Sequence, residues 1–129
     1  MANQRSTERQ QSGAAAEDLA QRHLAEHGLS LLARNVRFPF GELDLVMLDG
    51  SCVVFVEVRF RSSLRFGGAV MSVDANKRRK LARAAQAWLA GHRKFSAASC
   101  RFDVLAVTPA GNDLACEWIA SAFTMDDLW

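Results

Sequence analysis

The apolar positions of the chain repeat with two periods, one typical of helices and one of strands. Residues 13–27 carry apolar side chains at helical spacing, with Ser12 placed to cap the helix and Gly28 placed to end it. A second helix is predicted from its cap Asp74 to about residue 90. Its apolar stripe consists of Leu81, Ala84, Ala85, Trp88 and Leu89. Residues 1–12 are polar and aperiodic, so we expect a disordered tail there.

Five short segments are predicted to form strands. They cover residues 29–35, 42–48, 52–60, 101–107 and 114–120. Turns are predicted at residues 38–41, which read Phe-Pro-Phe-Gly, and at the Asp49-Gly50 pair. Residues 61–73 contain a Gly-Gly pair and no period, and are expected to form a loop. Because a helix separates the third strand from the fourth, we expect these two strands to be parallel.

The predicted order is helix, three strands, helix, two strands, which indicates an α/β sandwich with a mixed sheet of about five strands. With 129 residues, 50% of them hydrophobic, the chain suffices for one domain over residues 13–129. No stretch is long and apolar enough to span a membrane. The three cysteines form no CxxC pair, as is typical of free thiols in a reducing cytosol. We therefore expect a cytoplasmic protein without zinc.

Two charged residues interrupt the most apolar predicted strand. In VVFVEVRF (53–60), Glu57 and Arg59 are two positions apart and so share one face. A hairpin that turns at Asp49-Gly50 pairs residues whose numbers sum to roughly 100, which brings Asp44 within cross-strand reach of Glu57. Two carboxylates this close repel each other in the absence of a cation.

The residues alone leave two interpretations of this acidic pair. In the first, a hard divalent cation such as Mg²⁺ or Mn²⁺ binds both carboxylates through oxygen. In the second, Asp44, Glu57 and Arg59 form a buried ionic network that only orders the sheet.

In this chain, GELDLV (41–46) and FVEVR (55–59) lie on either side of the predicted hairpin turn. Together they resemble the active-site signature of the PD-(D/E)xK nuclease superfamily. Five further segments are similar, in the same order, to the YraN-type bacterial family of predicted endonucleases. They are AEDLA (16–20), RN (34–35), KRRKL (77–81), RFDVLAV (101–107) and WIASAF (118–123). That family is distantly similar to archaeal Holliday-junction resolvases. The resemblance implies a restriction-endonuclease-like fold, metal-dependent cleavage of DNA, including branched DNA, and a homodimer.

Several site residues follow from this resemblance. It implies Asp44 and Glu57 as metal ligands, with the backbone carbonyl of Val58 as a third. Glu17 matches an additional acidic residue of such nucleases, although an ordinary solvated helical glutamate is the alternative. Glu42 shares the face of Asp44 and is a weaker candidate.

Arg59 departs from the family pattern, which places lysine at this position. Arginine keeps the charge and binds phosphate, but it cannot act as a base. The alternative function is therefore a catalytically impaired accessory protein that binds nucleic acid on a nuclease scaffold. A purely structural protein–protein module is a third interpretation. Asp103 is expected to pair with an arginine rather than to bind metal.

Basic residues cluster after the third strand and at the start of the second helix. We expect Arg61, Arg65, Lys77, Arg78 and Lys80 to contact the phosphates of DNA. An ordinary solvated face is the alternative interpretation of this charge run.

Overall fold

The computed structural model describes the backbone of residues 2–60 and 73–123, and side chains from residue 13 onward within these ranges. The elements are α1 (Ala2–Glu26), β1 (Ser30–Phe38), β2 (Gly41–Asp49), β3 (Cys52–Phe60), α3 (Ala75–Ala90), η2 (Arg93–Phe95), β4 (Cys100–Ala110) and β5 (Asp113–Phe123). Their order confirms the predicted succession of helices and strands.

The strands form a single mixed sheet in the order β1-β2-β3-β4-β5. Neighbours are antiparallel except β3 and β4, which are parallel because the chain returns through α3 between them. The predicted α/β sandwich and its parallel pair are thereby confirmed. The β2–β3 turn places Gly50 at φ +61°, a left-handed conformation that glycine adopts without steric cost.

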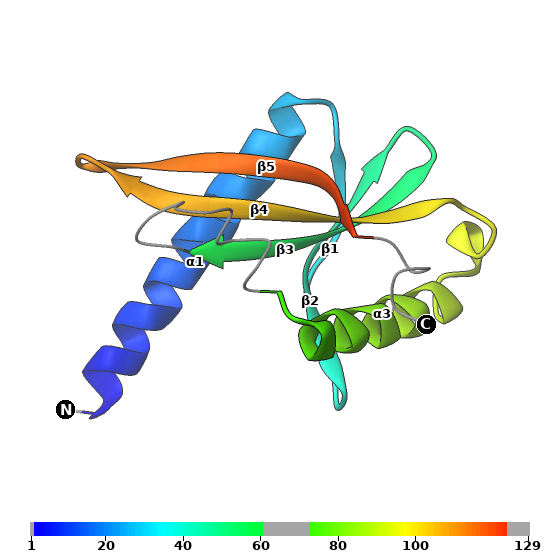
Figure 1. Cartoon of the computed structure of the whole chain (residues 1–129), viewed down its shortest axis with the longest axis horizontal. Helices are drawn as coiled ribbons and strands as arrows, with labels where there is room; N and C mark the ends of the chain where they lie inside the picture. Colours follow the sequence, from blue (N-terminus) through cyan, green and yellow to red (C-terminus); the bar gives the residue numbers. More distant parts are fainter. Residues whose placement is uncertain (1, 61–72, 124–129) are drawn as a thin grey trace.

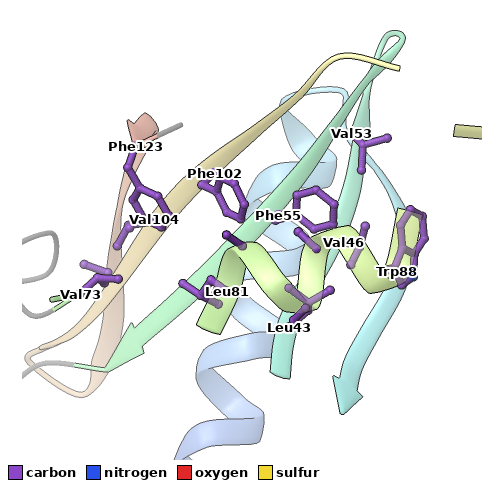
Figure 2. Packing of buried hydrophobic residues seen from close by; sticks show 14 residues of the cluster. Leu43, Val46, Val53, Phe55, Val73, Leu81, Trp88, Phe102, Val104 and Phe123 are labelled. Atoms are coloured by element: carbon purple, nitrogen blue, oxygen red, sulfur yellow. The ribbon is translucent and has the colours of Figure 1, made fainter. Parts of the chain in front are cut away.

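Helices α1 and α3 cover opposite faces of the sheet (Figure 1). The face toward α1 buries the side chains Ala16, Ala20 and Leu24 of the helix. On the other face, Leu81 and Trp88 of α3 pack over Phe55 of β3 and its neighbours (Figure 2). Since successive strand residues alternate between the two faces, the nearly continuous apolar run of β3 supplies both cores.

The N-terminal half of α3 is fixed against the start of β2. Asp74 caps the helix as predicted, because its Oδ1 accepts the Lys77 N–H at 2.8 Å. At Gly41 the backbones come so close that a Cβ would lie 2.8 Å from the carbonyl oxygen of Lys80. A glycine is therefore required there, and the contact sets the position of Lys77 relative to the sheet.

α1 begins at Ala2, whereas the sequence places its start at Gly13 with Ser12 as the cap. Ser12 lies inside the helix, so the predicted start is wrong. The residues before Gly13 include good helix formers and neither glycine nor proline, so the helix can extend through them. The division into a tail and a domain stays a prediction. Neither α1 nor α3 is long and apolar enough to cross a membrane, within the described residues.

Asp103 is completely buried in β4 and is a structural residue, as predicted. Its carboxylate accepts hydrogen bonds from Arg101 Nε at 3.1 Å, Trp118 Nε1 at 2.9 Å and the backbone N–H of Ser121 at 2.9 Å. Arg101 also donates to Asp49 at 3.0 Å. This network ties β4 to the bulge in β5 and to the end of β2, and it satisfies the buried charge.

Candidate active site

Asp44 and Glu57 meet where the β2–β3 ladder ends. Leu45 pairs with Val56, and the next position in this register places Asp44 level with Glu57. The regular pairing stops there, and the Val58 N–H donates to Oδ2 of Asp44 at 2.9 Å. The side chain of Asp44 thus replaces a backbone acceptor, and its carboxylate is held between the two strands.

The two carboxyl groups share a hydrogen bond in a buried environment. Burial, followed by the charge of Glu57, raises the pKa of Asp44 from 3.8 to about 7. The Glu57 side chain is only 5% exposed, and its burial raises its own pKa as well. The pair therefore holds a proton through the acidic range, and above that range the two carboxylates repel each other.

Two cations approach the same oxygen of Glu57 from different elements. Arg59 Nε lies 3.6 Å from Oε1 of Glu57, and Lys77 Nζ reaches that oxygen from α3 at 3.7 Å. The sequence assigns Lys77 to a DNA-backbone surface, whereas the structure brings it to the carboxylates. Its place in the first turn of α3 after Asp74 was readable from the sequence, but the contact depends on how α3 packs on β2.

Glu17 lies on α1 near the same pair. Burial and then the charge of Asp44 raise the pKa of Glu17, so its carboxylate lies within electrostatic range of Asp44. Arg34 Nε forms an ion pair with Glu17 Oε2 at 3.5 Å, and the Asn35 side chain hydrogen-bonds the same carboxylate. Sequence reasoning missed these two roles. The signal in the sequence is the pair RN (34–35), one of the segments that carry the family resemblance. In the structure Asn35 has a φ of 54°, a left-handed conformation that asparagine tolerates.

The predicted phosphate-binding residues fall into different environments. Arg61 and Arg65 lie outside the described residues. Arg78 is engaged in packing, because its Nε donates to the carbonyl of Val73 at 2.8 Å and its guanidinium lies over Phe123. DNA binding by these three arginines stays a prediction.

Lys80 and Glu42 lie at the rim of the site. Lys80 is exposed on α3, and its contact with DNA phosphates stays a prediction. Glu42 has a side chain 54% exposed and an ion pair with Arg37 at 3.8 Å. Glu42 acts on Glu57 only through its charge, which contributes to the raised pKa of Glu57.

The oxygen atoms of this site suit a hard divalent cation. Among the described residues there is no group of three or more His, Cys, Asp or Glu side chains arranged for metal binding. A site would therefore rely on Asp44, Glu57 and a backbone oxygen. Because the N–H and C=O of one strand residue point to the same neighbour, the carbonyl of Val58 also faces the Asp44 side. When two carboxylates share a proton, a divalent cation can replace that proton and bind both carboxylates.

Comparison with known proteins places the chain in one family. The family model described as "Uncharacterised protein family UPF0102" matches residues 16–107. A UPF0102 protein of Stutzerimonas stutzeri is 51% identical over 117 residues, which cover 91% of this chain and 98% of the relative. UPF0102 proteins of Xanthomonas campestris pv. campestris and Xylella fastidiosa (strain 9a5c) are each 52% identical over 119 residues, covering 92% of this chain and 96% and 97% of the relatives. The predicted resemblance is confirmed: the chain belongs to the UPF0102 (YraN-like) family.

Proposed function

We propose that this protein is a Mg²⁺- or Mn²⁺-dependent nuclease that hydrolyses phosphodiester bonds in DNA. The observation that supports this most is the contact between the buried carboxyls of Asp44 and Glu57, with two cations at the same oxygen of Glu57. A purely structural ion network does not need such repulsion, since Asp103 shows how this fold satisfies a buried carboxylate completely.

In this proposal, Asp44, Glu57 and the carbonyl of Val58 would hold the metal. A bound divalent ion supplies Lewis acidity and a water molecule that is more readily deprotonated. Hydrolysis adds a water molecule across one P–O ester bond. One product strand therefore carries the phosphate and the other a hydroxyl, and no oxidant or reductant is needed.

Lys77 supplies the lysine that the β3 strand lacks. Its ammonium and the guanidinium of Arg59 lie at nearly equal distances from Glu57 Oε1, 3.7 and 3.6 Å. Lys77 can orient a water beside Glu57 and stabilise charge on the phosphate as a compact cation, while Arg59 binds phosphate oxygens with its planar fork.

Glu17 adds negative charge at the α1 side of the site. Arg34 and Asn35 orient it, so that its carboxylate can accept a proton or a hydrogen bond from a water near Asp44. The rival function, an accessory protein without catalysis, depends on the missing strand lysine. The position of Lys77 weakens that argument and favours the enzyme.

Cleavage of a panel of labelled DNAs tests the proposed activity. Forks, flaps, four-way junctions and continuous duplex are incubated with the wild type or with Glu57→Gln, in Mn²⁺ or in EDTA. We expect Mn²⁺-dependent cleavage by the wild type and a loss of at least about 100-fold in Glu57→Gln. Equal cleavage by both proteins would show that the activity is a contaminant and would contradict the proposal.

The role of Lys77 is tested by removing its ammonium group and then introducing an ammonium group at position 59. Lys77→Ala should lower kcat about 100-fold, whereas Arg83→Ala, an exposed position on the same helix, should change it little. Adding Arg59→Lys to Lys77→Ala should restore part of kcat, because it returns an ammonium to the same carboxylate oxygen. If Lys77→Ala and Arg83→Ala behave alike, Lys77 has no role in the chemical step.

A further inference from the structure

An open pocket of about 410 Å³ lies between the tip of the β1–β2 hairpin and the N-terminal half of α3. Phe38, Phe40 and Gly41 line its hairpin side, and Lys77 and Lys80 line its helix side. The close contact of Gly41 with the backbone of Lys80 fixes the two walls relative to each other, so the pocket is preformed.

The hairpin side of the pocket presents a flat aromatic surface. The rings of Phe38 and Phe40 are stacked, with centroids 5.5 Å apart and planes 6° from parallel. Phe40 is 39% exposed and belongs to neither of the two core clusters of the sheet, so its packing in the core does not explain its presence. An exposed aromatic ring at a hairpin tip offers a surface on which another flat ring can stack.

The pocket is basic and continuous with the carboxylate site. Its charged lining is Arg37, Lys77, Lys80 and Glu42, of which Glu42 is already paired with Arg37 at 3.8 Å. Lys77 belongs to both places, because its Nζ also lies 3.7 Å from Glu57 Oε1. A ligand in the pocket would therefore have its anionic end within one side-chain length of the Asp44–Glu57 pair.

A ligand that is flat and aromatic at one end and anionic at the other fits this arrangement. We infer that the pocket binds one unpaired nucleotide of the DNA substrate, with its base stacked on Phe40 and its phosphate at Lys77 and Lys80. A base in continuous duplex is covered by its neighbours on both faces, so it cannot stack here. This inference rests on the proposed function and narrows its substrate class to DNA with an unpaired nucleotide next to the cleaved bond, as in flaps and forks.

Binding without cleavage tests the inference separately from the activity. Fluorescently labelled single-stranded and duplex DNA of equal length are titrated with protein in EDTA and followed by anisotropy. We expect Phe40→Ala to weaken single-strand binding roughly tenfold and Phe40→Trp to restore it, since stacking tolerates any large aromatic ring. Leu31→Ala, at an exposed apolar position on β1 outside the pocket lining, is the matched control and should bind like the wild type. Duplex binding should be the same for all four proteins.

A second readout locates the stacked base. With 2-aminopurine placed at successive positions of the single strand, its fluorescence should be quenched at one position in the wild type and released in Phe40→Ala. Lys80→Ala should reduce the salt dependence of single-strand binding by about one charge. Unchanged single-strand affinity and quenching in Phe40→Ala would overturn the inference.

The outcomes separate the subsite from the activity. Phe40-dependent binding without Mn²⁺-dependent cleavage would retain the nucleotide pocket and reject the nuclease. Cleavage with the same preference for unpaired over duplex DNA in wild type and Phe40→Ala would retain the nuclease and reject the pocket.

Discussion

Replacing Asp44 with asparagine should stabilise the metal-free protein at alkaline pH. Asparagine keeps an oxygen that can accept the Val58 N–H, and its amide can donate to Glu57 as protonated Asp44 does. It differs from Asp44 in that it never becomes charged. The variant therefore removes the repulsion between Asp44 and Glu57 with little change in shape.

The sign of the effect follows from the raised pKa. Asp44 has a pKa of about 7 in the folded protein against an ordinary value of 3.8. Between these two pH values the folded protein therefore keeps a proton on Asp44 that the unfolded chain has released. The stability of the wild type should therefore fall as the pH rises from about 4 to 7 and level off above that. At about 1.4 kcal/mol per pKa unit, Asp44→Asn should gain roughly 2 to 4 kcal/mol at pH 8 and nearly nothing at pH 4.

Urea unfolding in EDTA at a series of pH values measures this difference. The free energies of unfolding of the wild type and of Asp44→Asn should converge at pH 4 and separate as the pH rises. Glu117→Gln, an exposed carboxylate on β5, serves as the control and should follow the wild type throughout. Parallel curves, or a variant that is less stable than the wild type at pH 8, would refute the claim that ionised Asp44 and Glu57 repel each other in the folded protein.

Three other substitutions test the supports of the site. Gly41→Ala should cost about 2 kcal/mol in urea unfolding, because its Cβ would lie 2.8 Å from the carbonyl of Lys80 and α3 would have to shift; an unchanged midpoint would contradict the close contact. Asp103→Asn should cost about 3 kcal/mol by the same measurement without changing Mn²⁺ affinity, since it leaves a buried ionic network unbalanced. Asn35→Gly preserves the φ of 54° but loses the hydrogen bond to Glu17, so Mn²⁺-dependent cleavage should fall while the melting temperature stays nearly constant; a cleavage rate equal to that of the wild type would remove Asn35 from the site.

The sequence was informative about the fold because the periodicity of each element is local. The α3 stripe, its Asp74 cap and the tight turn at Gly50 can be read within a few residues, and each is confirmed. The start of α1 was wrong because polar helix formers give no apolar period even where the chain is helical. The homodimer and the cytoplasmic location stay predictions.

The sequence predicted only the part of the site that lies on one hairpin, β2–β3. The two-residue turn after Asp49 fixes the β2–β3 register, and this is why Asp44 and Glu57 could be paired from their numbers alone. Lys77 reaches Glu57 from a helix that follows β3, and its distance depends on the packing of α3 over Gly41. Such contacts between separate elements leave no local period to detect.

Isothermal titration of the metal-free protein with Mn²⁺ tests the central claim most directly. We predict that the wild type binds Mn²⁺ with measurable heat and releases a proton when titrated below pH 7, because the ion replaces the proton between Asp44 and Glu57. Asp44→Asn should bind at least about tenfold more weakly and release no proton. No heat from the wild type, or equal binding by Asp44→Asn, would contradict the assignment of these carboxylates as a metal site.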